Sequence, residues 1–253
     1  MSVASAYDST VREFANNARM ETRPMRTFNN KVKSALISEC VRYHRPSAVL
    51  DLCCGRGGDM GKILREPCVR FYQGIDISPE SIREAVSRSA THNRHGATIL
   101  TEVQDVSRGF TTNRVFNLIN QQFSLHYMWA PDTVDDFLAS LSSQLSPGGL
   151  WIGTVPNKGM IDAAISGELV LPPICRITPV NPHTYSFYLQ GCVAGVHEHY
   201  VRFNAEHLAQ YNLVLRLHTP MLEYAAQRGI FLRPENQRLI AGLYDVFIMQ
   251  KIE

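Results

Sequence analysis

The stretch AVLDLCCGRGGD at residues 48–59 decides the fold of this chain. Its first five residues are typical of a buried strand, and its glycines predict a turn that leads into a helix over residues 59–64. Four further strands are expected after it, at residues 69–75, 97–103, 115–123 and 150–155. Strands that alternate with helices form a mainly parallel sheet with right-handed crossovers. The sequence therefore predicts an α/β fold of the Rossmann-like kind.

Capping and stop signals place the helices around these strands. Residues 29–44 have apolar side chains at helical spacing, with Asn30 as the expected cap. A second helix is expected to begin at Ser78, and a third runs over residues 131–145 until Pro147, Gly148 and Gly149 stop it. The remainder is less regular: the prolines predict an irregular connection at 169–182, strands are expected at 185–189, 196–201 and 244–250, and helices at 204–211 and 220–228.

Composition limits the class of protein. The 253 residues are 45% hydrophobic and 19% charged, which is enough apolar material for one sizeable domain. The net charge is +2, but residues 1–45 alone hold eight basic and four acidic side chains. This basic segment fits either a phosphate-rich partner or ordinary solvated helix faces. No apolar run is long enough for a membrane span, and the first residues lack the pattern of a signal peptide.

Cysteine and histidine spacing argues against a metal site. The six cysteines include no C-x-x-C pair, and reduced thiols in an intracellular protein are the simplest interpretation. The HEH sequence at residues 197–199 lacks the one-face spacing of a zinc-binding helix. We therefore expect neither a metal nor a disulfide framework.

Acidic residues end the first three expected strands. Asp51 lies at the end of the first strand, Asp76 ends the second, and Asp105 follows the third. Ligands of open parallel sheets bind outside the carboxyl ends of the strands. Nicotinamide or flavin binding is the first alternative, but Cys53 replaces the first glycine of the G-x-G-x-x-G pattern. A turn without a ligand is the second. Three acidic strand ends favour a nucleoside ligand without a pyrophosphate, most commonly S-adenosylmethionine.

Five segments resemble the mRNA cap (guanine-N7) methyltransferases. They are RTFNNKVKS at 26–34, LDLCCGRGGDM at 50–60, QQFSLHY at 121–127, PGGLWIGTVPN at 147–157 and VHEHYV at 196–201. The resemblance runs from about Arg23 to the last residue. It implies a class I S-adenosylmethionine-dependent methyltransferase fold with a C-terminal cap-binding insertion. Residues 1–22 would be an N-terminal arm, and 23–253 one methyltransferase domain with a cofactor half at 23–157 and an acceptor half at 158–253.

The resemblance also implies residue roles. The cofactor-binding residues would be Lys33, Asp51, Cys53, Gly55, Asp76, Asp105, Gln122 and Tyr127. The cap-binding residues would be Asn29, Asn30, Arg56, Lys62, Arg88, His126, Glu198 and Tyr244. His126, Tyr127 and Glu198 would position the reacting groups. The sequence departs from the family at Cys53, which replaces glycine, at Lys31, which replaces an aromatic residue, and at Arg56, which replaces lysine.

The implied reaction moves a methyl group from S-adenosylmethionine to N7 of a GpppN cap and leaves S-adenosylhomocysteine. Guanine N7 has a free lone pair, so positioning and electrostatics suffice without a general base. The compact size resembles the methyltransferase domain of a large DNA virus capping enzyme. RNA triphosphatase and guanylyltransferase would then act with it, on the same parent chain or as separate proteins. The expected location is the cytoplasm or virion for a virus and the nucleus for a cellular enzyme.

Two other functions stay open at this point. One is a methyltransferase that uses the same cofactor but acts on a small molecule or a protein. The other is a catalytically silent, methyltransferase-like subunit that binds RNA.

Overall fold

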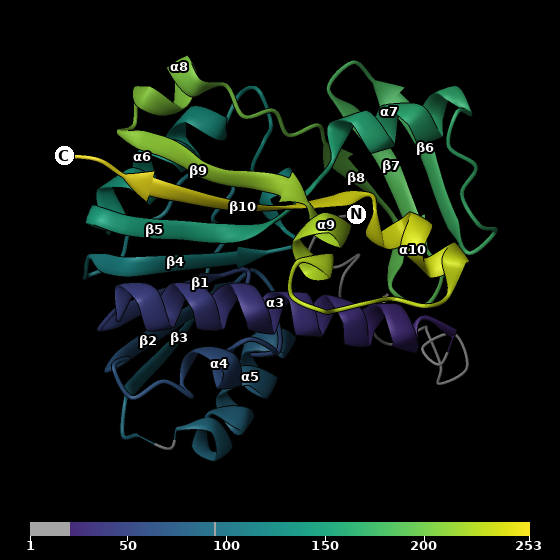
Figure 1. The fold of residues 1–253 in the computed structure, drawn as a ribbon. Helices are drawn as coiled ribbons and strands as arrows, with labels where there is room; N and C mark the ends of the chain where they lie inside the picture. The colour runs from purple at the N-terminus through teal and green to yellow at the C-terminus, as the bar shows by residue number, and fades with distance from the viewer. Residues whose placement is uncertain (1–20, 94) are drawn as a thin grey trace.

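The computed structural model describes residues 21–93 and 95–253, and Figure 1 shows their arrangement. Within these ranges one seven-stranded sheet has the order β3-β2-β1-β4-β5-β10-β9. Its strands are β1 (Ala48–Leu52), β2 (Phe71–Asp76), β3 (Thr98–Val103), β4 (Phe116–Gln122), β5 (Leu145–Pro156), β9 (Leu213–Pro220) and β10 (Tyr244–Lys251). The strands from β1 to β5 are parallel, whereas β10 is antiparallel to both of its neighbours, β5 and β9. The predicted α/β fold with a mainly parallel sheet is confirmed.

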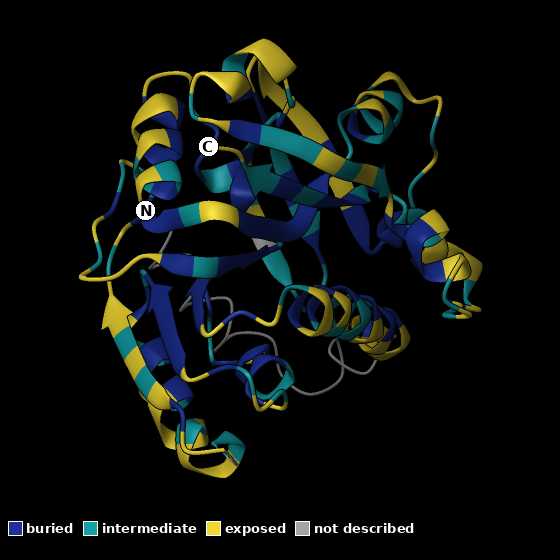
Figure 2. Ribbon diagram, turned by 60° about the vertical axis from the view of Figure 1, so that its left-hand side comes forward, coloured by how far each residue is buried: buried dark blue, intermediate teal, exposed yellow. Residues whose placement is uncertain are grey.

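Alternating side chains divide the core into two layers, one on each face of the sheet. Leu118 and Ile152 belong to the core cluster that contains α3 (Arg23–His44), whereas Ile119 and Trp151 belong to the cluster that contains α6 (Val134–Gln144). Neighbouring strand residues thus point to opposite faces. In Figure 2 the central strands are dark blue and the outward surfaces of the helices are yellow. Both faces of β1 are covered, so all five of its residues are buried.

Two helices and one 3-10 helix follow strands β1, β2 and β4. Helix α4 (Met60–Ile63) follows the glycine turn, and α5 (Pro79–His92) follows β2. The hydroxyl of Ser78 accepts a hydrogen bond from the backbone N–H of Ser81, so the expected helix start is confirmed. The 3-10 helix η1 (Leu125–Tyr127) follows β4 at the carboxyl end of the strands. These connections bring the segments after β1, β2 and β4 to one edge of the sheet.

A second, three-stranded antiparallel sheet lies between α7 (Lys158–Ser166) and α8 (Ala205–Ala209) in the chain. Its strands are β6 (Cys175–Asn181), β7 (Thr184–Leu189) and β8 (Val193–His199). It confirms the strands expected at 185–189 and 196–201. Residues of β8 contact η1, so the inserted sheet meets the main sheet where its parallel strands end. In Figure 1 it stands beside the end of the main sheet.

The N-terminal boundary of the first helix differs from the prediction. Helix α3 begins at Arg23 rather than 29, and Asn30 lies inside it instead of capping it. The apolar stripe continues backward through Phe28 and Met25, and Pro24 occupies the first turn, where proline is tolerated. The expected arm at residues 1–22 lies outside the described residues as far as residue 20. Thr22 precedes the helix and is buried.

Several later elements also differ from the sequence prediction. Helix α6 ends at Gln144, and Pro147, Gly148 and Gly149 lie within β5. The segment expected to be irregular contains β6, which accommodates Pro179 because it is an edge strand with a register shift beside that proline. The sequence patterns do not predict β9, α7 or α10 (Glu235–Ala241), and the helix expected at 220–228 is the shorter α9 (Met221–Ala226) in the structure. None of the described helices is long and apolar enough to cross a membrane.

Candidate active site

The glycine turn after β1 lies against the end of β2. The backbone N–H of Cys54 donates to the carbonyl of Ile75, at 3.0 Å, and that of Gly55 donates to Oδ2 of Asp76, at 2.8 Å. Cys53 has a φ of +55°, a left-handed conformation that favours glycine. Cys53, which replaces the family's glycine, therefore adopts a backbone conformation that glycine would adopt with less strain than cysteine.

A chain of hydrogen bonds runs from Asp51 to Gln122. Both carboxylate oxygens of the buried Asp51 accept bonds of 2.7 Å, one from the hydroxyl of Tyr72 and one from Nδ2 of Asn120. Oδ1 of Asn120 in turn accepts from Nε2 of Gln122, at 2.8 Å. This chain orients the Gln122 amide and leaves its Oε1 buried without a partner in the described structure. Burial, followed by the charge of Asp59, raises the pKa of Asp51 to about 7.

Asp59 is a buried carboxylate held between two lysines. Nζ of Lys33 lies 2.9 Å from its Oδ2, and Nζ of Lys62 lies 2.5 Å from its Oδ1. Burial opposes ionisation of Asp59, but the two ammonium groups outweigh burial and hold its pKa below the ordinary value. Lys33, predicted to bind the cofactor, and Lys62, predicted to bind the cap, are thus both paired with Asp59. The sequence analysis missed Asp59, although its place three residues before Lys62 was a usable signal.

The other two acidic strand ends lie where they were expected. Asp76 ends β2, and its oxygens accept from the backbone N–H groups of Gly55 and Ser78, at 2.8 and 2.9 Å. Asp105 follows β3, is exposed, and accepts from the N–H of Ser107, at 2.9 Å. A carboxylate oxygen that accepts one bond retains another lone pair. Asp105 can therefore accept a further hydrogen bond from a ligand, and Asp76 lies at the end of β2 beside the glycine turn.

A second buried carboxylate has neutral surroundings. Oε2 of Glu198 accepts from the hydroxyl of Tyr185 at 2.8 Å, and Nε2 of His126 lies 3.4 Å from its Oε1. Burial raises the pKa of Glu198 to about 8. Burial, with a smaller contribution from His199, lowers the pKa of His126 to about 3, so its ring is neutral near pH 7. Neither ring nitrogen of His126 makes a hydrogen bond within the described structure.

Aromatic rings line the space around this carboxylate. Tyr244 begins β10, and its ring centroid lies 5.0 Å from Phe123 and 6.5 Å from Phe187. The rings of His126 and Tyr127 are 4.2 Å apart. Phe123 has a φ of +55°, and its N–H donates to Oγ1 of Thr154 at 2.9 Å. The residues that sequence analysis missed here are Tyr185, Phe123 and Thr154.

The other predicted cap-binding residues lie outside this pocket, and Lys62 is paired with Asp59 as described above. Arg56 and Arg88 both reach Glu84, with Nη1 of Arg56 at 3.0 Å from Oε2 and Arg88 paired with the other oxygen. Asn29 lies one turn before Lys33 on α3, and its Oδ1 is buried without a partner in the described structure. Asn30 is exposed on the same helix, and no contact brings it to the others.

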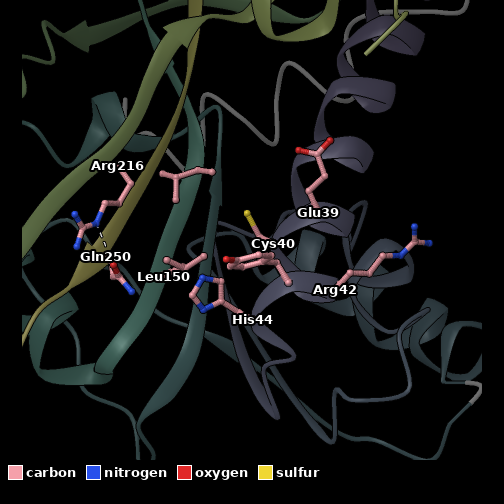
Figure 3. Close-up of a pocket in the computed structure, with 9 residues that line it drawn as sticks. Glu39, Cys40, Arg42, His44, Leu150, Arg216 and Gln250 are labelled. Atoms are coloured by element: carbon pink, nitrogen blue, oxygen red, sulfur yellow. Dashed lines mark hydrogen bonds between the residues drawn. The ribbon is translucent and has the colours of Figure 1, made fainter. Parts of the chain in front are cut away.

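A groove elsewhere contains none of the predicted site residues. It has a volume of about 610 Å³ and lies between the end of α3 and the strands β5, β9 and β10 (Figure 3). Its lining includes Cys40, Tyr43, Leu150 and Ile248. Leu150 belongs to the first half of β5, so the groove lies away from the carboxyl edge that carries the acidic residues. It is therefore separate from the candidate site.

Solved structures with similar folds are S-adenosylmethionine-dependent methyltransferases. One from Clostridium acetobutylicum has a TM-score of 0.60 and 17% identity over 99% of this chain and 98% of its own. The N-methyltransferase NodS from Bradyrhizobium japonicum, in complex with S-adenosyl-L-homocysteine, has a TM-score of 0.58 and 16% identity over 98% and 99%. These likenesses establish the class I S-adenosylmethionine-dependent methyltransferase fold, as the sequence predicted.

The relatives found by sequence are described more specifically than the solved structures with similar folds. An mRNA cap guanine-N(7) methyltransferase of Lodderomyces elongisporus is 25% identical over 95% of this chain and 53% of its own length. An mRNA cap guanine-N(7) methyltransferase 1 of Arabidopsis thaliana is 32% identical over 54% of this chain and 40% of its own. The chain spans about half or less of the length of these curated relatives.

The family model that matches is described as the mRNA (guanine-N(7))-methyltransferase domain. It covers residues 2–168, which is more than half of the chain and includes the glycine turn, Asp76, Asp105 and Gln122. The match also includes Phe123, His126 and Tyr127, whereas Tyr185, Glu198 and Tyr244 lie beyond it. Fold, matched domain and relatives agree, and the chain belongs to the mRNA (guanine-N7) methyltransferase family.

Proposed function

We propose that this chain is an mRNA cap guanine-N7 methyltransferase that uses S-adenosylmethionine. The observation that carries the proposal is the buried Glu198, which lies beside η1 and has no cationic partner within hydrogen-bonding reach among residues 21–93 and 95–253. A carboxylate in such a place suits a ligand that brings its own N–H donors, as the N1–H and N2–H groups of guanine do. The acidic strand ends next to this pocket suit a nucleoside cofactor.

The described residues fit S-adenosylmethionine. Asp76 ends β2 beside the glycine turn, where its carboxylate would accept from ribose hydroxyls, and Asp105 is placed for the adenine amino group. The unpartnered Oε1 of Gln122 supplies a buried acceptor beside β1, where the amino acid part of the cofactor would lie. When bound, the cofactor supplies an electrophilic sulfonium methyl group. Lys33 and the backbone around Cys53 and Gly55 would complete the cofactor contacts.

The chain's own residues would act by positioning. Guanine N7 already has a lone pair, so no residue needs to remove a proton from it before methylation. Glu198, His126 and Tyr244 would hold the base, and Tyr127 would border the methyl group. Methylation gives guanine a positive charge, which the carboxylate of Glu198 would stabilise. Proximity and electrostatic preorganisation thus supply the rate enhancement.

The wider partners follow from this activity. Capped RNA would be the substrate, with Arg56, Lys62 and Arg88 near its ribose and phosphates and Asn29 and Asn30 near the cap. An RNA triphosphatase and a guanylyltransferase must supply that cap, on the same parent chain or on separate proteins. The six cysteines are free thiols, which suits a reducing intracellular location such as the cytoplasm or nucleus. A viral parent chain stays a prediction.

The test is methyl transfer from labelled S-adenosylmethionine to GpppA-capped RNA, with GTP and uncapped RNA as further acceptors. Digestion then locates the label. We expect the label in N7-methylguanosine from capped RNA and none from uncapped RNA. Cofactor binding without transfer to any guanine acceptor would contradict the proposed activity. Label on another atom or on a protein would instead identify a methyltransferase with a different substrate.

A further inference from the structure

We propose that Tyr185 is a positioning residue of the acceptor pocket, which fixes the Glu198 carboxylate in the orientation that selects guanine. This inference rests on the proposed function, because it names a determinant of base recognition in that same pocket. Tyr185 lies outside the five segments that resemble the family. Its role follows from where β7 places it.

The strand register brings the two side chains together. Tyr185 and Glu198 are direct cross-strand partners in the antiparallel β7–β8 pair. Such partners project from the same face of the sheet, with Cβ atoms about 4.5–5.5 Å apart. The hydroxyl of Tyr185 donates to Oε2 of Glu198 at 2.8 Å, and both residues are buried. The carboxylate is therefore held by a rigid strand residue rather than by a flexible cation.

The tyrosine itself is fixed in place. It lies on the central strand of the inserted sheet, and its ring centroid is 5.0 Å from that of Tyr200. Phe187, two residues further along β7, faces the same side and contacts Tyr244. The hydroxyl has little freedom to move away from Oε2. The other oxygen of Glu198, Oε1, points toward His126. Each of the two carboxylate oxygens can still accept a hydrogen bond from an N–H group of a ligand.

The surroundings make this one hydrogen bond important. Among the described residues, the titratable groups next to Glu198 are His126 from η1, Tyr185 from β7, Tyr244 from β10 and Cys175 from β6, and Tyr127 from η1 lies near Tyr185 and Tyr244. None of these groups is cationic near neutral pH, since the pKa of His126 is about 3. Burial raises the pKa of Glu198, and the Tyr185 hydroxyl lowers it. Tyr185 is thus the group that favours the ionised carboxylate before a base is bound.

Guanine recognition should depend on this ionised form. An ionised carboxylate accepts from both N1–H and N2–H of guanine, whereas a protonated one must point its own O–H at a donor. Inosine lacks the 2-amino group, so it reports the second of these bonds. Without the Tyr185 hydroxyl, the carboxylate is free to rotate and stays protonated to a higher pH. The preference for guanine over inosine should then decrease.

The experiment measures kcat and KM for GpppA and for its inosine counterpart with the wild type and Tyr185→Phe, between about pH 6 and 9. We expect Tyr185→Phe to raise KM for GpppA about tenfold or more, since a hydrogen bond to a charged group is lost. The guanine-to-inosine ratio should decrease, and the rise of kcat/KM with pH should move to higher pH. The dissociation constant of S-adenosylhomocysteine should stay within about twofold, because the cofactor contacts are untouched.

Two further variants separate positioning from a merely structural effect. Tyr188→Phe is the matched control, because Tyr188 lies on the same strand but is only partly buried and packs against Arg176. It should behave as the wild type. Fluorinated tyrosine at position 185 strengthens the hydroxyl as a donor and preserves the packing. It should move the pH rise in the opposite direction from Tyr185→Phe, and it serves if the phenylalanine variant does not fold.

The outcomes distinguish the two levels of the proposal. A wild type that methylates GpppA, with a Tyr185→Phe variant of unchanged base preference and pH profile, overturns the role of Tyr185 alone. An unchanged pH profile with fluorinated tyrosine does the same. A wild type that binds the cofactor but transfers no methyl group to GpppA overturns the proposed function and this inference with it.

Discussion

Two buried carboxylates, one beside the glycine turn and one in the inserted sheet, have opposite surroundings. Asp59 beside the glycine turn lies between Lys33 and Lys62, and its pKa is below the ordinary value. Glu198 in the inserted sheet faces Tyr185 and a neutral His126, and its pKa is raised to about 8. The first charge is compensated within the fold. The second is left for a ligand to compensate, which is the arrangement expected of a recognition group.

The largest expected effect tests the compensated side. Asp59→Asn leaves two largely buried ammonium groups without their partner, so we expect it to lower the free energy of unfolding by about 3–5 kcal/mol. The measurement is urea denaturation at neutral pH. Glu84→Gln is the matched control, since Glu84 also joins two cations but with about a third of its side chain exposed. It should cost less than about 1 kcal/mol. Equal costs would mean that burial of Asp59 does not matter.

The next effect tests the uncompensated side through activity. Glu198→Gln keeps the shape but cannot accept from both guanine N–H groups or stabilise the methylated base. We expect kcat/KM for GpppA to decrease about 10²–10³-fold, with cofactor affinity unchanged. Methyl-transfer kinetics and calorimetry with S-adenosylhomocysteine measure the two quantities. Unchanged turnover would remove Glu198 from the cap pocket.

A smaller effect is expected at Asp76, the proposed ribose acceptor. Asp76→Ala should weaken cofactor binding about 10–150-fold, because a hydrogen bond to a charged group contributes about 1.5–3 kcal/mol. Asp105→Ala should weaken it less, since Asp105 is exposed and competes with water. Calorimetric titration of S-adenosylhomocysteine gives both constants. A loss below threefold for Asp76→Ala would argue against its role as a ribose acceptor.

The Glu198→Gln variant should also differ from the wild type in the pH dependence of its stability. The folded pKa of Glu198 is raised to about 8 from its ordinary 4.5, so the wild type loses stability as pH rises through this interval. Glutamine does not titrate, so the variant should gain stability over the wild type, on the order of 1–3 kcal/mol at pH 8 and none below pH 4. Thermal unfolding of both proteins across this range measures it. A gain that is independent of pH would show that charge is not the cause.

The smallest expected effect concerns the backbone. Cys53→Gly removes a side chain from a left-handed residue, which should stabilise the fold by about 1 kcal/mol. Activity should stay close to that of the wild type, because the backbone that faces the cofactor is retained. Denaturation and methyl-transfer assays test both parts. A loss of stability would show that packing of the Cys53 side chain outweighs its backbone strain.

The sequence predicted the regular part of the fold well, for local reasons. Strands β1, β2, β4 and the start of α5 have strong signals: buried apolar runs, an aspartate at a strand end, and the Ser78-Pro79 cap. The antiparallel strands were harder to predict. Strand β9 alternates between intermediate and exposed residues, and β6 contains Pro179, so neither has a distinct pattern. Their formation depends on partners that lie far away in the chain.

In the candidate site, too, the residues with local sequence signals were predicted, and those that depend on distant partners were not. The acidic residues at strand ends were found because a strand end can be read locally. Tyr185 was missed because its link to Glu198 depends on cross-strand register, which only the folded sheet defines. Asn30 was assigned as a helix cap because the polar residues at 29–31 interrupt the apolar pattern, although the stripe continues on the far side of them. Long-range pairing is what the sequence alone did not reveal.

The position of β10 has a consequence for how the protein is made. This strand is the last in the chain, yet it lies between β5 and β9 and carries Tyr244 at its first position. During translation, β5 and β9 can pair through it only after residues 244–251 have left the ribosome. Until then the edge of β5 is an unpaired strand, open to misassembly and in need of chaperone protection. Strands β1 to β5 can therefore pair before β10 is available, and Tyr244 reaches the neighbourhood of Phe123 and Phe187 only when β10 joins the sheet.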